Sequence, residues 1–176
     1  MLTHNDVVAS APPGVCLDLA VDVEAWPELL PHYRRVVFRR RDARGRGRVE
    51  MAAVRRFGPL PYPVWWVSEM TSDLSAGRIR YRHVEGITKG MEVEWRLEPS
   101  PWGTRIEIVH AWTGPTWPLI GEFAARRVIG PHFVHVVADR TLSGIAAAAR
   151  ELASSGPEPG DGEAATGSPG GSHAPV

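Results

Sequence analysis

The sequence predicts an α+β fold in which a seven-stranded antiparallel sheet wraps around a long C-terminal helix. Six strand-like segments follow one another in the middle of the 176-residue chain, and the short turn signals between them favour antiparallel pairing. A further strand and two short helices precede these segments, and a long helical period follows them. Because one helix fills the concave face of such a sheet only in part, we expect a cavity that suits a small apolar ligand.

The N-terminal elements follow from local signals. A strand is expected around residues 5–9, and Ser10 is a suitable N-cap for a helix over residues 13–22. A second short helix begins at Pro27, and Pro31 ends it because proline cannot continue a helix.

The strands of the middle region are bounded by clusters of glycine, proline, aspartate and serine. They cover residues 33–41, 49–56, 64–71, 78–85, 91–98 and 104–112. Strand alternation predicts which side chains share the apolar, inward face. In the last three strands this face carries Ile79, Tyr81, His83, Met91, Val93, Trp95, Leu97, Ile106, Ile108, His110 and Trp112.

The C-terminal region is helical and then loses its pattern. A short helix is expected over residues 118–129, the Gly-Pro pair at 130–131 breaks it, and a longer helix covers residues 132–152. Residues 154–176 are rich in glycine, proline and serine and are predicted to be disordered, which leaves one folded domain over residues 1–153. Apolar spacing predicts that the buried face of the long helix consists of Val134, Val137, Thr141, Ile145, Ala148 and Leu152.

Composition argues against several classes of function. Twenty basic and 20 acidic side chains give a formal net charge of zero. The protein therefore has no electrostatic field of one sign that would attract nucleic acid or an anionic membrane. Cys16 is the only cysteine, so an intramolecular disulfide and a Cys-rich metal site are impossible. No apolar run approaches the ~18 residues of a membrane span, and the first ten residues do not read as a signal peptide. We expect a cytoplasmic protein that is a monomer or a homodimer.

Three segments carry a resemblance to a known family. They are VEAWPELLPHYRRV at residues 23–36, WWVSEM at 65–70, and the run from HVEGITKGMEVEWRLEP to GTRIEIVHAW at 83–112. Over residues 5–153 the chain resembles the START-like polyketide cyclase/dehydrase superfamily, and within it the bacterial polyketide aromatase/cyclases most. The resemblance implies the helix-grip fold, which the predicted element order matches. The resemblance also implies that the inward face of the strand at 64–71 carries Val64, Trp66, Ser68 and Met70.

His110 and Tyr33 are the leading catalytic candidates. A neutral imidazole on an apolar strand face can act as general base or acid, since the ordinary pKa of histidine lies near neutrality. The resemblance implies an aldol-type ring closure followed by loss of water, which needs proton removal next to a carbonyl and donors for the enolate. It also implies that the Tyr33 hydroxyl reaches the cavity. The alternatives are a hydrogen-bonded core histidine and a tyrosine that packs beneath the first strand.

Aromatic and apolar side chains would form the substrate-binding walls, although core packing explains them almost as well. The candidates are Trp26, Trp66, Ser68, Met70, Tyr81, His83, Met91, Val93, Trp95, Ile108 and Trp112. Met70 departs from the aromatase/cyclase pattern, in which several members carry an arginine proposed to polarise a substrate carbonyl. Arg140 or Arg56 would have to replace that cation. Asp139 or Arg140 would complete a site with His110 if the helix turned them inward, and a structural ion pair is the alternative.

Neither a metal nor another cofactor is expected. His83, His110, His132 and His135 lack an accompanying carboxylate motif, although the last two are spaced as i and i+3 on one helix. The arginine run at residues 39–48 lies at a predicted hairpin, where charged side chains are usually solvated. The alternative is recognition of an anionic partner, such as an acyl carrier protein that delivers a tethered substrate.

Three functional hypotheses follow. The leading one is a polyketide aromatase/cyclase-like enzyme that binds a poly-β-ketone chain in its cavity and guides aldol cyclisation and dehydration. The second is a non-catalytic lipid-, quinone- or isoprenoid-binding protein, which Met70 favours. The third is an interaction module of the toxin–antitoxin type found in the same superfamily, which would use the arginine hairpin and need no cavity.

Overall fold

One antiparallel sheet of seven strands organises the chain. A computed structural model describes residues 1–42, 46–57, 60–114 and 134–155, with only the backbone described at 55–57 and 60–61. The strand order is β1-β7-β6-β5-β4-β3-β2, so β1 and β2 are the two outer strands. The strands are β1 (Leu2–Ala9), β2 (Tyr33–Arg41), β3 (Gly47–Phe57), β4 (Leu60–Asp73), β5 (Arg78–Gly86), β6 (Glu92–Ser100) and β7 (Gly103–Ala111).

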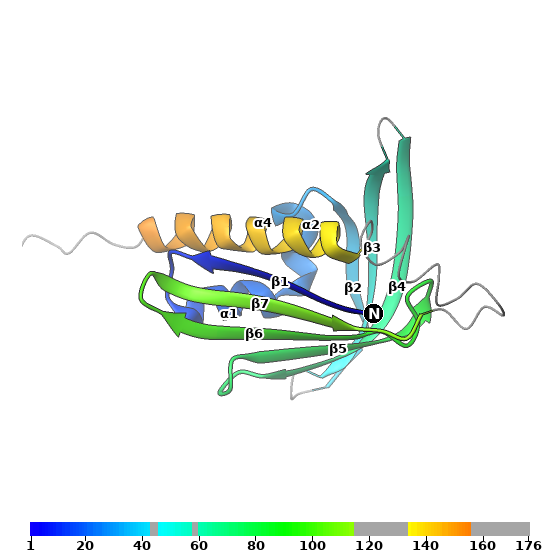
Figure 1. The fold of residues 1–176 in the computed structure, drawn as a ribbon, viewed down its shortest axis with the longest axis horizontal. Coiled ribbons are helices and arrows are strands. Elements are labelled where there is room, and N and C mark those ends of the chain that lie inside the picture. The colour runs from blue at the N-terminus through cyan, green and yellow to red at the C-terminus, as the bar shows by residue number, and fades with distance from the viewer. Residues whose placement is uncertain (43–45, 58–59, 115–133, 156–176) are drawn as a thin grey trace, which may run out of the picture.

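Helices cover the concave face of this sheet. The connection from β1 to β2 carries α1 (Pro13–Val21), η1 (Val23–Ala25) and α2 (Trp26–Leu29), and the chain closes with α4 (His135–Ser154). Figure 1 shows the sheet curving around α4, which packs against β1, α1 and α2. This arrangement confirms the predicted helix-grip fold. None of the helices in the described part of the chain has the length and apolar character needed to cross a bilayer.

The helix ends differ from the sequence predictions for local reasons. Pro12, not Ser10, is the N-cap of α1, and no side chain caps that end. The ring of Pro13 already sets the backbone angle of the first helical residue, so the helix starts there without a cap. α4 continues through Ser154, the first residue assigned to the disordered tail. The predicted helix at 118–129, its Gly-Pro break and the tail beyond residue 155 lie outside the described residues.

The buried face of α4 is only partly the predicted one. Thr141 and Ile145 are buried as expected, whereas Val137 and Ala148 are half-buried and Leu152 is 55% exposed. Leu152 lies in the last turn, over a surface hollow beside α1. Two of the other buried positions carry the small side chains of Ala138 and Ala149, and a third carries Leu142. The residues buried on this helix and just before it are Val134, Ala138, Thr141, Leu142, Ile145 and Ala149.

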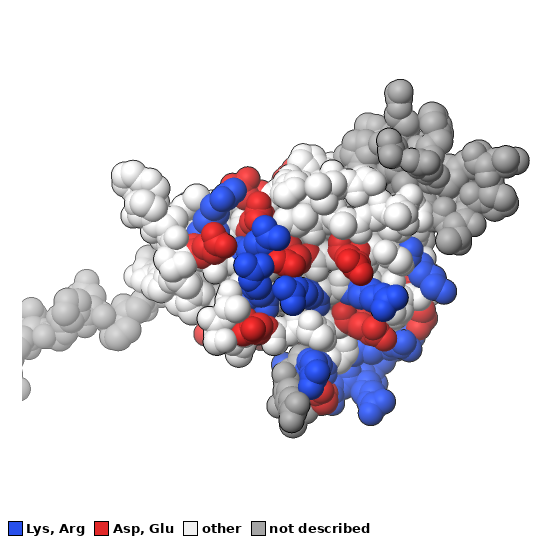
Figure 2. Space-filling view, turned by 60° about the horizontal axis from the view of Figure 1, so that its bottom comes forward, with Lys and Arg blue, Asp and Glu red and all other residues white. Residues whose placement is uncertain are grey.

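Ion pairs between side chains of different strands cover the outer face of the sheet. The Arg39 guanidinium of β2 donates to Glu50 of β3 at 2.9 Å and to Glu85 of β5 at 3.1 Å. Hydrogen bonds from Arg96 and other arginines lower the pKa of the Glu94 carboxyl on β6 to about 2. Figure 2 shows the basic and acidic side chains interleaved on this face. The arginine hairpin is therefore partly neutralised by carboxylates of its own sheet.

The turn between β6 and β7 depends on Gly103. Its φ of +127° is one that L side chains rarely adopt, and a Cβ there would collide with the backbone of Ala9 and Ala11. We therefore expect Gly103→Ala to lower the free energy of unfolding by about 1–3 kcal/mol, measured by urea denaturation.

Gly14→Ala in α1 is the matched control for this substitution. Nothing lies within 4 Å of a Cβ added at Gly14, and alanine has the higher helix propensity. The control is expected to be as stable as the wild type or more stable. A Gly103→Ala protein with the stability of the wild type would contradict the prediction.

Candidate functional site

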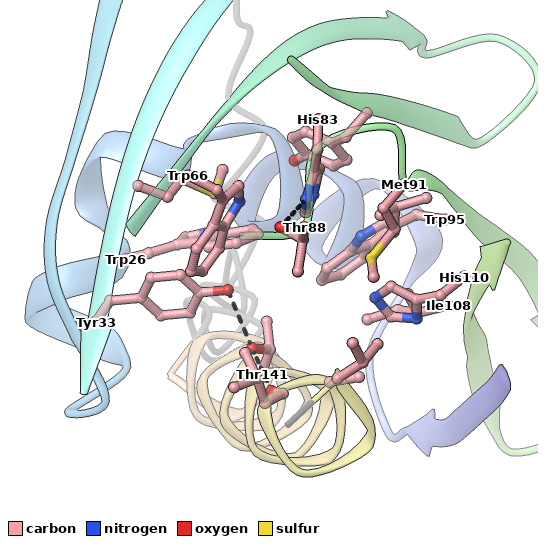
Figure 3. A pocket seen from close by; sticks show the side chains of 16 residues that line it. Trp26, Tyr33, Trp66, His83, Thr88, Met91, Trp95, Ile108, His110 and Thr141 are labelled. Atoms are coloured by element: carbon pink, nitrogen blue, oxygen red, sulfur yellow. Dashed lines mark hydrogen bonds between the residues drawn. The ribbon is translucent and has the colours of Figure 1, made fainter. Parts of the chain in front are cut away.

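A cavity lies between the concave face of the sheet and α4 (Figure 3). About 70 Å³ of it is open to the centre of a water-sized sphere, which is room for several water molecules. A larger organic ligand therefore needs lining side chains to move apart. The described residues that line the cavity are Trp26, Tyr33, Met51, Trp66, Tyr81, His83, Thr88, Met91, Val93, Trp95, Ile108, His110, Val134, Val137, Ala138 and Thr141.

Aromatic rings form one wall of the cavity. Trp26 packs edge-on to Tyr33, with ring centroids 5.2 Å apart, and lies 5.6 Å from the ring of Trp95. The ring of Trp66 on β4 lies 6.2 Å from that of Tyr33. The Trp26 indole N–H donates to the carbonyl oxygen of Leu19 at 3.0 Å, which fixes the ring against α1. The rings are thus held in place and offer faces that suit flat or conjugated ligands.

His83 of β5 is held at the cavity by two contacts. Its ring stacks on that of Trp66 at a centroid distance of 5.8 Å, and its Nδ1 lies 2.7 Å from the hydroxyl oxygen of Thr88. Burial, with a smaller contribution from His110, lowers the pKa of the His83 imidazole to about 3. This imidazole is therefore neutral at pH 7, and its Nδ1 is already engaged.

His110 of β7 is a buried imidazole with an unpartnered ring nitrogen among the described residues. Its backbone pairs with Val93 of β6 and Thr3 of β1, so the ring comes from the strand next to the outer strand β1. The Nδ1 atom has no hydrogen-bond partner among the described residues. Burial, and to a lesser extent the nearby His135, lowers the pKa of the His110 imidazole to about 4. A buried polar atom without a partner is costly, which favours a role toward a ligand in the cavity.

Two tyrosines add hydroxyl groups to the lining. The Tyr33 hydroxyl oxygen lies 3.4 Å from the hydroxyl oxygen of Thr141 on α4, and the Tyr81 hydroxyl has no partner among the described residues. Burial raises the pKa of both phenols, that of Tyr33 to about 12. Both hydroxyls therefore stay protonated at neutral pH and can donate to an oxygen of a ligand.

Three of the predicted wall residues do not reach the cavity. Ser68 and Met70, which the resemblance placed on the inward face, and Trp112, which the alternation placed there, are buried, but they are not among the lining residues. The Trp112 indole N–H instead donates to the carbonyl oxygen of Lys89 at 3.0 Å. The other predicted wall residues all line the cavity.

Asp139 and Arg140 lie away from the cavity. α4 turns Ala138 and Thr141 toward the interior, so the two residues between them face outward and are exposed. The Asp139 Oδ1 atom accepts a hydrogen bond from the side-chain amide of Asn5 at 2.6 Å. Asp139 is therefore engaged with Asn5, and neither Asp139 nor Arg140 is among the described residues that line the cavity.

The described lining of the cavity carries no charged group. The cation that Arg140 would supply in place of the family arginine is absent from the lining, and the side chain of Arg56 lies outside the described residues. Nor do three His, Cys, Asp or Glu side chains cluster as metal ligands within the part of the chain that the structure describes. His135 instead lies 3.4 Å from Asp139 at the surface, and His132 lies outside the described residues. Any chemistry in the cavity would have to rely on neutral imidazole and hydroxyl groups among these residues.

Several lining residues were not predicted as ligand contacts. Strand alternation in 49–56 offered a signal for Met51, and helical spacing already predicted that Val134, Val137 and Thr141 are buried. Thr88 lies in a turn, where no periodic signal exists. The lining residues missed as ligand contacts are Met51, Thr88, Val134, Val137, Ala138 and Thr141.

Comparison with known proteins gives consistent relatives. A family model described as polyketide cyclase / dehydrase and lipid transport matches residues 9–129. A protein of Streptomyces cyaneus named "Putative polyketide cyclase" is 32% identical over 111 residues, which cover 59% of this chain and 67% of that relative. A protein of the same name from Streptomyces halstedii is 32% identical over 109 residues, which cover 57% of this chain and 91% of the relative.

Solved structures share the fold. The Zhui aromatase/cyclase from Streptomyces sp. R1128 superposes with a TM-score of 0.73 at 17% identity, over 89% of this chain and 98% of that chain. The protein TTHA0849 from Thermus thermophilus superposes with a TM-score of 0.72 at 24% identity, over 88% of this chain and 99% of that chain. At these identities the likeness concerns the fold alone.

Proposed function

The chain belongs to the polyketide cyclase/dehydrase and lipid transport family, and from this premise we propose that it is a polyketide aromatase/cyclase. The cavity receives a poly-β-ketone chain, carried by an acyl carrier protein, and guides an aldol ring closure followed by loss of water. The held aromatic wall selects one folded conformation of the chain, which brings the reacting carbons together.

The observation that carries this proposal is the neutral His110 imidazole with an unpartnered Nδ1 at an apolar cavity. In the ring closure it removes a proton from a methylene group between two carbonyls, and the electron pair forms an enolate. Tyr33 donates a hydrogen bond to the enolate oxygen. The enolate carbon then attacks a second carbonyl carbon, and the imidazolium returns its proton to the new alkoxide.

Dehydration needs an acid and a base at the same time. The His110 imidazole takes a second proton from the carbon next to the new alcohol, and the C–O bond breaks. The departing hydroxyl needs a proton from another group, since the imidazole is acting as base. Tyr33 is the neutral donor for this proton, so the oxygen leaves as water and a conjugated ring remains.

Met70 is the observation that favours a second candidate function. A methionine cannot polarise a carbonyl, so a protein of this fold without the family arginine would bind an apolar ligand without changing it. The two functions differ in product formation and not in binding. An experiment must therefore measure both.

The test combines the protein with a minimal polyketide synthase that releases a reactive poly-β-ketone chain on its carrier protein. We expect the wild type to replace the spontaneous mixture by one ring-closed, dehydrated product, detected by liquid chromatography and mass spectrometry. Ala138→Phe fills the cavity and is expected to restore the spontaneous mixture. Ala148→Phe, on the same helix but outside the lining, is the matched control and should behave as the wild type.

Binding is followed in parallel by quenching of tryptophan fluorescence, since three of the described tryptophans line the cavity. A wild-type protein that binds the chain but leaves the spontaneous mixture unchanged would establish the binding function instead.

A further inference from the structure

We propose that Thr141 and His32 form a proton relay that connects the Tyr33 hydroxyl in the cavity with a groove on the surface beside α4. The inference rests on the proposed cyclase function, because the relay supplies the proton that the dehydration step consumes. It makes Thr141 and His32 positioning residues that act through Tyr33.

The relay follows hydrogen-bond distances between three side chains. The Thr141 hydroxyl oxygen lies 3.4 Å from the Tyr33 hydroxyl oxygen and 3.1 Å from Nε2 of His32. Figure 3 shows the Tyr33 and Thr141 hydroxyls pointing toward each other across the edge of the cavity. The Thr141 hydroxyl already has a partner in its own helix, the Val137 carbonyl oxygen at 2.8 Å. The two further neighbours are therefore not needed to satisfy it, and rotation of the hydroxyl can direct its proton to another partner.

The two ends of the relay open to different spaces. Tyr33 and Thr141 line the internal cavity, whereas His32 lines a separate groove of about 580 Å³ on the outside of the molecule. Arg140 and Ser143 of α4 form part of the same groove. Because His32 and Tyr33 are consecutive, the turn that leads into β2 and the first residue of β2 carry one side chain toward each space. The three side chains of the relay thus connect water in the groove with a substrate oxygen in the cavity.

A stepwise proton transfer would form charged groups in buried positions. A concerted transfer along the three side chains of the relay is therefore preferable. Burial raises the pKa of Tyr33 to about 12, so a lone tyrosinate in the cavity is unfavourable. Burial and then the Arg140 charge lower the pKa of His32 to about 4, so an imidazolium there is unfavourable too. A relay that moves one proton at each link at the same time forms neither ion.

Each group of the relay gives up one proton and receives one. The Tyr33 O–H bond breaks and its proton goes to the departing hydroxyl group of the substrate, which leaves as water. The Thr141 hydroxyl passes its proton to the Tyr33 oxygen and receives one from Nε2 of His32. His32 takes a proton at Nδ1 from a groove water, so it changes tautomer and stays neutral, and the hydroxide left in the groove is neutralised by the proton that His110 later releases. His110 holds the proton removed from carbon and releases it to water when the product leaves.

The test measures dehydration separately from ring closure. A short poly-β-ketone thioester is incubated with each variant, and early samples are analysed for the cyclised alcohol and for its dehydrated product. Thr141→Val keeps the shape of the side chain without the hydroxyl, and we expect the alcohol to accumulate as dehydration slows by roughly 10–100-fold, with KM unchanged. Thr141→Ser keeps the hydroxyl and is expected to restore the wild-type ratio.

His32→Ala gives a second, independent variant. It is expected to accumulate the same alcohol, and added imidazole, which can enter from the groove, should restore dehydration. Ser143→Ala, which changes the groove outside the relay, is the matched control and should leave the ratio unchanged. An unchanged ratio in Thr141→Val, or in His32→Ala without imidazole, would overturn the relay and leave the cyclase function intact. A wild-type protein that forms no cyclised product would overturn both.

Discussion

Replacing His110 by glutamine is expected to lower the rate of cyclised product per folded molecule by roughly 10²–10⁴-fold, the usual loss when a general base is removed. Glutamine can still form hydrogen bonds and has a similar length, so the strand and the cavity wall should persist. It cannot take a proton from carbon at neutral pH. Both ring closure and dehydration should therefore fail together, in contrast to the Thr141 variants, which should fail in dehydration alone.

The measurement is product per folded protein, with the melting temperature and the ligand-induced quenching of tryptophan fluorescence recorded beside it. Binding should survive, because apolar walls provide most of it. His135→Gln is the matched control: it removes a titratable neighbour of His110 without changing the lining, and its rate should remain near that of the wild type. A His110→Gln protein that retains the wild-type rate would remove His110 from the mechanism and favour a binding protein.

Acidification from pH 7 to pH 5 is expected to destabilise the fold by several kcal/mol. Burial lowers the pKa of His32, His83 and His110 to about 4, 3 and 4, while an unfolded histidine has a pKa near 6.5. Above pH 6.5 both states are neutral and the stability is complete. Between pH 6.5 and 4 the unfolded chain binds protons that the folded chain does not, so stability falls as pH falls.

The size of this effect follows from linkage. Each histidine contributes a slope of about 1.4 kcal/mol per pH unit in that window, so three together give at most about 4 kcal/mol per unit. From pH 6.5 to 5 the loss approaches about 5 kcal/mol, because the slope reaches its limit only below pH 6.5, and this is comparable with the whole stability of an ordinary domain. Glu94 adds a later loss, because its carboxyl has a pKa of about 2 when folded and its ordinary value is 4.5. The Glu94 contribution is complete above about pH 4.5 and disappears as pH falls toward 2.

Urea denaturation at pH 7, 6 and 5 checks this prediction. His83→Gln should reduce the slope of stability against pH by about one third, since one of three contributing groups is gone. His4→Gln, which removes an exposed histidine, is the matched control. Equal stability at pH 7 and pH 5 in the wild type would show that protons reach these imidazoles without unfolding.

Periodicity in the last three strands, and the family resemblance in residues 64–71, predicted which side chains face inward, but neither predicted which of them reach the cavity. Ser68 and Met70 share the inward face with Trp66, yet only Trp66 reaches the lining. Alternation depends on the backbone of one strand, whereas access to a cavity depends on which side chains of other elements cover each position. The same limit applies to α4, where apolar spacing favoured Leu152 and the packing of neighbouring elements selected Ala138 and Ala149 instead.

The relay could not be predicted from sequence at all. Thr141 and Tyr33 are 108 residues apart, and no local pattern relates them. His32 lies within a recognised segment but carries no periodic signal of its own. The role proposed for His32 depends on its contact with α4, which lies near the other end of the chain. His110 was found because a polar residue on an otherwise apolar strand face is visible in the sequence itself.

The position of β2 at the edge of the sheet has a consequence for aggregation. An outer strand leaves part of its backbone unpaired, and a second chain can add to it. Five of the nine residues of β2 are arginine, and the Phe38 amide donates to the carboxylate of Glu24 at 3.0 Å. Two copies joined at this edge would bring their arginine runs together, and like charges would repel. The arginine run of β2 thus opposes the addition of a second chain to this edge of the sheet, whatever other partner the run binds.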